Sequence, residues 1–102
     1  MIAALAPAGL AGMLAGCGTT RSGAAPVTGK ALFADLGCGS CHTLAAAGAH
    51  GTIGTNLDAD PPSRGAVVDA VTNGASGMPS FKARLTAKQI RDLAAYVVTE
   101  TH

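Results

Sequence analysis

The sequence predicts an all-α fold of short helices joined by long loops, and three observations support this prediction. Apolar residues recur at helical spacing in three segments, and each segment follows a Ser or Thr that can cap a helix. Glycine, proline, asparagine and aspartate gather between these segments, which is typical of loops. No segment shows the strict alternation of a half-buried strand. We therefore expect one small helical domain.

The first helix is expected over residues 29–36. Thr28 can cap its N-terminus, and Leu32, Phe33 and Leu36 fall on one face. The glycine that follows ends this helix directly before the pair of closely spaced cysteines. Residues 43–62 are rich in loop-forming residue types and are expected to form a long loop.

The second helix is expected to follow Ser63 as its cap and to stop at Gly74. Its residues available for burial are Val67, Val68 and Val71. A further loop, ASGMPSF, carries Met78. The last helix has the clearest pattern, because Thr86 and Gln89 form a capping box before an apolar stripe. That stripe consists of Ile90, Leu93, Ala94 and Val97.

The composition limits both the core and the possible partners. The chain has 102 residues and only three aromatic side chains, Phe33, Phe81 and Tyr96. Because aromatic residues usually supply much of the buried area, the core is underfilled, and a large apolar cofactor would complete it. The formal net charge of +1 argues against a nucleic-acid-binding protein.

The N-terminal part differs from the rest of the chain. Residues 2–16 carry no charge, and every acidic and basic residue lies after Cys17. The stretch Leu-Ala-Gly-Cys that ends at Cys17 resembles a bacterial lipobox, although no Lys or Arg precedes it. We expect residues 1–16 to be a signal peptide that is removed, with Cys17 lipidated. Residues 17–28 then form a flexible tether, and residues 29–102 form the domain.

A non-lipidated secretory signal is the alternative for this segment. Under the first interpretation the domain lies at the outer face of the bacterial cytoplasmic membrane or in the periplasm, held by its lipid anchor.

The stretch GCGSCHTL places Cys38, Cys41 and His42 within five positions and allows three chemistries. A structural zinc site needs a second close pair of ligands, whereas His50 and His102 stand singly. A thioredoxin-type dithiol needs a preceding strand, and none is expected here. The third chemistry is covalent haem attachment, because cysteines at i and i+3 project on the same side of one helical turn. The C-x-x-C-H string is typical of this attachment.

Beyond this string, the chain resembles a class I, mono-haem cytochrome c over about residues 29–99. The resemblance rests on four stretches in order, LFADLGCGSCH, GTIGTNL, GMPSF and LTAKQIRDLAAYVV. It implies the cytochrome c fold wrapped around one covalent haem c. In that fold Phe33 and Tyr96 belong to the crossing of the first and last helices.

The resemblance also implies an axial ligand on each side of the haem iron, namely His42 and Met78. Met78 is the one methionine outside the expected signal peptide, and Pro79 stiffens the backbone beside it. In the family, the carbonyl of a proline in the first loop accepts a hydrogen bond from the proximal histidine. Thr55 stands at that position, so a carbonyl of residues 53–55 is the candidate acceptor. Candidate walls of the haem pocket are Leu57, Val67, Val68, Val71, Phe81 and Leu85.

With two protein ligands the iron has no open position, so we expect a monomeric, membrane-tethered electron carrier and not an enzyme. The expected donor is a quinol-oxidising complex or a dehydrogenase, and the expected acceptor is a terminal oxidase. The alternatives are a haem enzyme or gas sensor with a displaceable sixth ligand, or a cytochrome subunit of a larger oxidoreductase. The basic residues between 82 and 91 are either a solvated face or a docking patch for an acidic partner.

Overall fold

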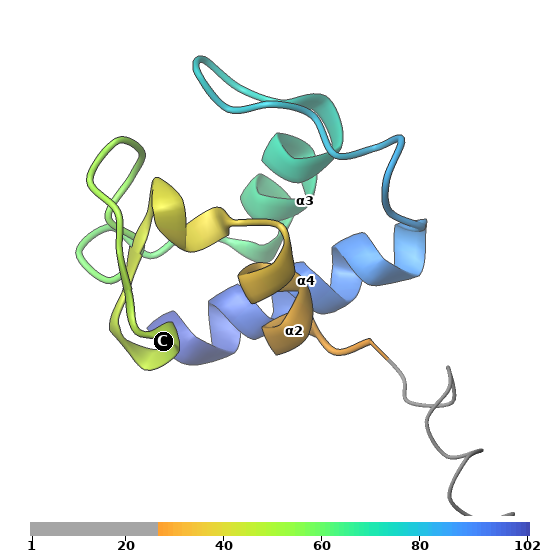
Figure 1. Ribbon diagram of the computed structural model, residues 1–102. Helices are drawn as coiled ribbons and strands as arrows, with labels where there is room; N and C mark the ends of the chain where they lie inside the picture. Colours follow the sequence, from red (N-terminus) through yellow and green to blue (C-terminus); the bar gives the residue numbers. More distant parts are fainter. Residues whose placement is uncertain (1–26) are drawn as a thin grey trace, which may run out of the picture.

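The structure is a computed structural model that describes residues 27–102. The expected signal peptide, Cys17 and nearly all of the expected tether lie outside the described residues. Three α-helices dominate the described part, which confirms the all-α prediction (Figure 1). In chain order the elements are α2 (Gly29–Asp35), the 3-10 turn η1 (Cys38–Ser40), β1 (Thr43–Leu44), the 3-10 turn η2 (Ala45–Ala47), β2 (Ala49–His50), α3 (Arg64–Asn73) and α4 (Ala87–Thr101).

Each helix begins at the cap that the sequence predicts. The Thr28 and Ser63 hydroxyl oxygens accept hydrogen bonds of 3.1 Å from the third backbone N–H that follows each of them. At α4 the Thr86 hydroxyl accepts from the Gln89 N–H at 3.1 Å, and the Gln89 side chain accepts from the Thr86 N–H at 2.8 Å. Both bonds satisfy donors that a helix N-terminus leaves without partners. The capping box is therefore confirmed.

Helices α2 and α4 cross at close range, with α2 lying in front of α4 in Figure 1. The approach is possible because Gly29 has no side chain, since a Cβ there would lie 2.7 Å from the Tyr96 Cβ. Near the crossing the Phe33 and Tyr96 rings pack with centroids 5.8 Å apart and planes tilted by 57°. The expected place of both aromatic residues at this crossing is confirmed.

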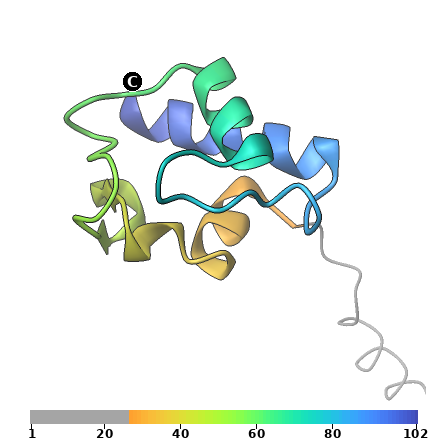
Figure 2. The same cartoon turned by 90° about the horizontal axis from the view of Figure 1, so that it is seen from above.

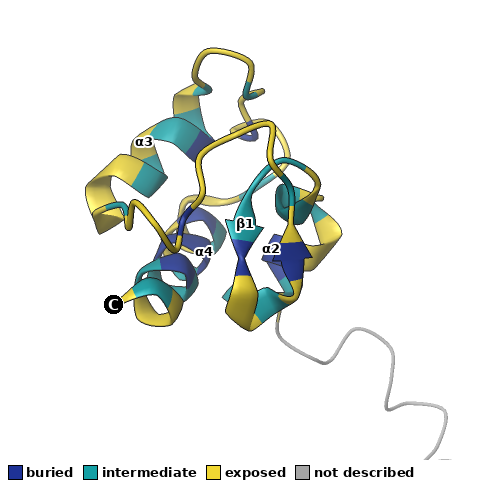
Figure 3. Cartoon of the chain, turned by 90° about the vertical axis from the view of Figure 1, so that its left-hand side faces the viewer, coloured by how far each residue is buried: buried dark blue, intermediate teal, exposed yellow. Residues whose placement is uncertain are grey.

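Helix α3 also packs against α4, so α4 contacts both of the other helices (Figure 1, Figure 2). Four residues of α4 are buried: Ile90, Leu93, Ala94 and Val97. From α3 only Val71 is buried, while Val67 and Val68 are half-buried and pack against the core. The loops are largely exposed (Figure 3).

The loop over residues 43–62 contains structure that the sequence did not reveal. Strands β1 and β2 form an antiparallel pair in which Thr43 lies opposite His50. Each strand has only two residues, which is too short for an alternating pattern. Within this pair Leu44 is fully buried, so the hairpin contributes to the same core as the helices.

Tyr96 offers a test of the helix crossing because it is the one tyrosine in the chain. Burial, and secondarily the negative charge of Glu100, raise the pKa of Tyr96 above its ordinary value near 10. Glu100→Gln should therefore lower this pKa, as followed by NMR of the tyrosine ring against pH. Asp60→Asn, in an exposed loop, serves as the control and should leave it unchanged.

The sign of the linked stability effect follows from the direction of this pKa shift. Because the folded pKa is the higher one, folding stability is complete below the unfolded value and falls as the pH rises toward the folded value. A Tyr96 pKa equal in wild type and Glu100→Gln would contradict the assigned contribution of Glu100.

Candidate functional site

The two cysteines of the candidate site lie on a single turn that follows α2. Gly37 adopts the left-handed conformation with φ of 75°, which ends the helix and starts η1. The Cys38 carbonyl then accepts from the Cys41 N–H at 3.2 Å and from the His42 N–H at 3.0 Å. Within residues 27–102 both thiols are free of disulfides and half-buried. Burial raises the pKa of the Cys38 thiol, whose side chain packs against the core.

The His42 imidazole is held in one tautomer by a backbone carbonyl. Its Nδ1 lies 2.8 Å from the carbonyl oxygen of Thr55. Because a carbonyl can only accept, Nδ1 carries the proton, and Nε2 keeps a lone pair that can bind a metal. Thr55 occupies the position at which the family resemblance implies a proline. Its carbonyl is the acceptor, which confirms the prediction of an acceptor within residues 53–55.

A strap formed by residues 51–57 runs beside the cysteine turn and carries this acceptor. The Gly51 N–H donates to the His42 carbonyl at 3.1 Å, and the Gly54 N–H donates to the Cys41 carbonyl at 2.6 Å. Further along, the Leu57 N–H donates to the Thr43 carbonyl at 3.0 Å. The strap is thus tied to three consecutive residues, Cys41 and His42 at the end of the turn and Thr43 in β1, which fixes the position of the Thr55 carbonyl.

Gly54 lies against one face of the His42 ring. A Cβ built on Gly54 would be 2.8 Å from Cε1, 3.1 Å from Nδ1 and 3.2 Å from Nε2. These distances show that the Cβ would lie above the ring plane and not in it. An atom 2.8 Å directly above Cε1 would be about 3.1 Å from both nitrogens, because the ring C–N bonds are about 1.3 Å long. The glycine backbone therefore contacts the flat side of the imidazole and leaves no room for a side chain. Its φ is not in the left-handed region, so the ring contact and not the backbone conformation requires glycine here.

Met78 is presented by a tight turn between α3 and α4. The Ala75 N–H donates to the Met78 carbonyl at 3.0 Å, and the Met78 N–H donates to the Ala75 carbonyl at 2.8 Å. Gly77 has φ of 77°, as the third position of a type II turn requires. The Met78 side chain is half-buried and packs against the same core cluster as Cys38.

The other predicted residues fall into two groups. All six candidate pocket residues belong to the core: Leu57, Val71 and Phe81 are buried, and Val67, Val68 and Leu85 pack against them. His50 is exposed on β2, and His102 is exposed at the end of α4. Within the described part of the chain, no three His, Cys, Asp or Glu side chains gather in a way that could hold a metal ion.

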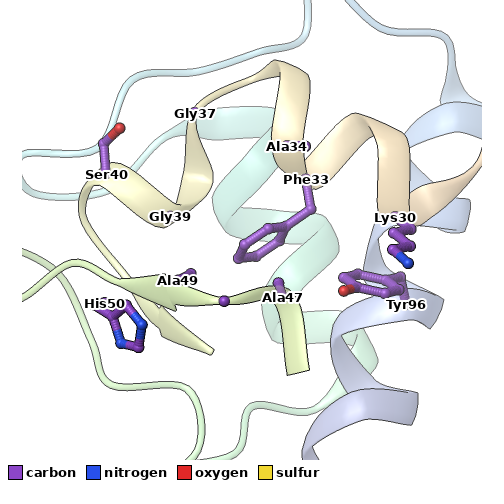
Figure 4. A pocket seen from close by; sticks show the side chains of 11 residues that line it. Lys30, Phe33, Ala34, Gly37, Gly39, Ser40, Ala47, Ala49, His50 and Tyr96 are labelled. Atoms are coloured by element: carbon purple, nitrogen blue, oxygen red, sulfur yellow. The ribbon is translucent and has the colours of Figure 1, made fainter. Parts of the chain in front are cut away.

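A surface hollow near the cysteine turn is distinct from the candidate ligand set. It is bordered by α2, η1, β2 and α4, and its walls include Lys30, Phe33, Ser40, His50 and Tyr96 (Figure 4). None of Cys38, Cys41, His42 or Met78 lines it.

The basic stretch between residues 82 and 91 is partly neutralised within the chain. Lys88 forms an exposed ion pair of 2.7 Å with Asp92 one helical turn later. The Arg84 guanidinium lies 5.5 Å from the centre of the Phe81 ring. These contacts are typical of a solvated helix face and do not by themselves distinguish it from a docking patch.

The described residues fit a covalently bound haem. Two thiols share one turn, an imidazole with a fixed tautomer follows immediately, and a thioether sits on a rigid turn. Cys38 and Met78 both border the same apolar core, which suits a flat apolar ring.

The roles of Gly51 and Gly54 were not predicted from the sequence, although both belong to the motif GTIGTNL and lie within a few residues of the expected acceptor.

Comparison with known proteins identifies the family. The family model described as cytochrome c oxidase, cbb3-type, subunit III, matches residues 24–97. Cytochrome c6 of Synechocystis sp. is 37% identical over 87 residues, which cover 81% of this chain and 72% of that protein. Cytochrome c6 of Limnospira maxima is 57% identical over 35 residues, which cover 34% of this chain and 39% of that protein. The chain thus matches well under half of the Limnospira protein.

A solved structure gives the same result for the fold. The c-type cytochrome SorU from Sinorhizobium meliloti superposes with a TM-score of 0.67 at 41% identity. The match covers 72% of this chain and 86% of SorU.

In the part that the structure describes, no helix is long and apolar enough to cross a membrane.

These likenesses correct one prediction. The chain was expected not to be an enzyme, on the ground that an iron with two protein ligands cannot bind substrate. The likeness to the c-type cytochrome SorU overturns this exclusion, and the matching family is itself described by a subunit of an oxidase. A protein that only passes electrons can still be a working part of an enzyme, so ligation of the iron does not decide the question.

The cysteine turn, the fixed imidazole, the helical fold and the matches over most of the chain agree with one another. The chain belongs to the c-type cytochrome family described as cytochrome c oxidase, cbb3-type, subunit III, and its cofactor is a covalently bound haem c.

Proposed function

We propose that the protein is a one-electron carrier in which Cys38 and Cys41 attach the haem and His42 and Met78 are its axial ligands. The observation that carries the proposal is the hydrogen bond from His42 Nδ1 to the Thr55 carbonyl. This bond places the proton on Nδ1, so Nε2 keeps the lone pair that can bind iron. The haem supplies one-electron cycling between the ferric and ferrous states. The chain's hydrogen bonds position the two ligands, and the apolar core beside Cys38 and Met78 offers an apolar surface to the haem.

The proposed setting is the outer face of a bacterial cytoplasmic membrane or the periplasm, with a lipid on Cys17 and a tether up to residue 28. The proposed partners are a quinol-oxidising complex or dehydrogenase as donor and a terminal oxidase as acceptor. A second candidate is a cytochrome subunit of a larger oxidase or dehydrogenase, which the description of the matching family favours. Co-purification of a stoichiometric redox complex would favour this second candidate.

Covalent attachment and ligation are tested together by spectroscopy. Wild type expressed in a host that matures c-type cytochromes should keep its haem through acid extraction, whereas Cys38→Ala combined with Cys41→Ala should release all of it. The oxidised wild type should show the weak near-infrared band of sulfur-to-iron bonding, and Met78→Ala should lose it.

Reduced wild type should be inert to carbon monoxide, whereas reduced Met78→Ala should bind it, because removal of the thioether opens the sixth position. Prompt binding by wild type would instead favour a haem enzyme or gas sensor. A colourless wild-type protein whose Cys38 and Cys41 both remain free to alkylate would reject the proposal.

Gly54→Ala tests whether the strap sets the His42 ring. The added methyl would lie within 3.0 Å of Cε1, so the ring or the strap must move. We expect a loss of about 1–3 kcal/mol in the free energy of unfolding, as for an overpacked core. The electron paramagnetic resonance g values of the ferric protein should also change.

Gly65→Ala is the matched control, because a Cβ at Gly65 meets nothing within 4 Å. It should leave the g values unchanged and should not lower the free energy of unfolding, because alanine is favoured over glycine in a helix. Unchanged g values in Gly54→Ala would show that Gly54 does not restrict the imidazole.

Cys17→Ser tests the membrane tether. Wild type should partition into the detergent phase of a cloud-point separation, and its N-terminal peptide should carry a diacylglyceryl mass on Cys17. Two acyl chains bind a bilayer firmly, at about 0.8 kcal/mol per buried methylene. Cys17→Ser should move to the aqueous phase with an unaltered haem spectrum. A mature wild-type N-terminus at another residue would support the non-lipidated secretory alternative.

A further inference from the structure

The loop that carries Met78 is closed at its base onto the end of α3. The last carbonyls of a helix have no partner within the helix. In α3 two of them are satisfied by residues beyond Met78: the Phe81 N–H donates to the Val71 carbonyl at 2.8 Å, and the Ser80 hydroxyl donates to the Thr72 carbonyl at 2.6 Å. The helix end and the base of the loop therefore stabilise each other.

The Ser80 hydroxyl is oriented by a second bond. Its oxygen accepts from the Lys82 N–H at 3.2 Å while its proton is directed at Thr72. The side chain thus joins the end of α3, the loop and the start of the segment that leads to α4. Among the described residues of the loop over 74–81, Ser80 is the one whose side chain donates to α3. The other hydrogen bonds between this loop and α3 are backbone bonds, which side-chain substitution leaves in place.

Met78 lies close to the hydrogen bond between Ser80 and Thr72. Only Pro79 separates it from Ser80, and a proline fixes φ and so limits independent movement of its neighbours. Gly74 lies directly beneath the same backbone, since a Cβ there would be 2.9 Å from the Met78 carbonyl oxygen and 3.1 Å from the Ser80 nitrogen. A displacement of the Ser80 backbone should therefore also displace the Met78 backbone.

We propose that Ser80 is a positioning residue whose hydrogen bond to the Thr72 carbonyl holds Met78 in the sixth ligand position and sets how readily an external ligand replaces it. This inference rests on the proposed role of Met78 as an axial ligand. It places control of ligand exchange in one exposed side chain outside the haem pocket. When the bond is lost, the base of the loop opens more often and competition with Met78 becomes easier.

Imidazole binding to the ferric holoprotein tests the inference. Ser80→Ala should bind imidazole roughly two- to tenfold more tightly than wild type, the factor that corresponds to the net contribution of one hydrogen bond. Ser80→Thr keeps a hydroxyl and should restore the wild-type affinity. Ser76→Ala is the matched control, because Ser76 lies at the exposed tip of the same loop and its side chain makes no hydrogen bond in the described structure.

Amide hydrogen exchange gives a second readout that does not depend on the haem spectrum. In Ser80→Ala the Phe81 and Met78 amides should exchange faster, while the capped first turn of α4 should keep its protection. Equal imidazole affinity and equal exchange in wild type and Ser80→Ala would overturn the inference. A wild-type protein without the sulfur-to-iron band would instead reject Met78 as a ligand, and the exchange experiment would still report on the fastening of the loop.

Discussion

The hydrogen bond between His42 Nδ1 and the Thr55 carbonyl is the constraint on which the rest of the site depends. It selects the tautomer, leaves the lone pair of Nε2 free and joins the cysteine turn to a segment thirteen residues further along. Such a bond needs a carbonyl at a fixed place, and the strap provides it through its own bonds to Cys41, His42 and Thr43. The lack of side chains at Gly51 and Gly54 allows the strap to lie this close.

The two proposed ligands are held by a similar mixture of bonds. On the His42 side, backbone bonds tie the strap to residues 41–43, and the Thr43 hydroxyl donates to the Gly51 carbonyl at 2.7 Å. On the Met78 side, backbone bonds close the turn, and the Ser80 hydroxyl donates to the Thr72 carbonyl at 2.6 Å. One hydroxyl therefore supplements the backbone bonds on each side. The sides differ in sequence distance, because His42 follows Cys41 directly whereas Met78 arrives from a separate loop.

Much of the fold was predictable because its determinants are local. The caps at Thr28, Ser63 and Thr86 lie within three residues of the groups they satisfy, and the apolar stripe of α4 is visible in the sequence alone. The attachment motif is equally local. The acceptor for His42 could be predicted to within three residues, and it is the carbonyl of Thr55. Every residue has a backbone carbonyl, so the replacement of a proline does not remove the acceptor.

What the sequence did not reveal depends on contacts between distant residues. Gly54 and Ser80 look like ordinary loop residues until the fold brings them against His42 and Thr72. The β1–β2 pair was missed because two-residue strands carry no periodicity. The exclusion of an enzyme was wrong for another reason: it followed from the iron alone, whereas participation in an enzyme depends on the assembly around it.

The close crossing at Gly29 has a mechanical consequence. The chain enters the domain at Thr28, so a force applied through the N-terminal side meets the interlocked pair of α2 and α4 first. Neither the strap beside His42 nor the turn that bears Met78 lies between the point of entry and this pair. We expect traction from that end to be borne first by the packing of α2 against α4, before it reaches the proposed ligands His42 and Met78.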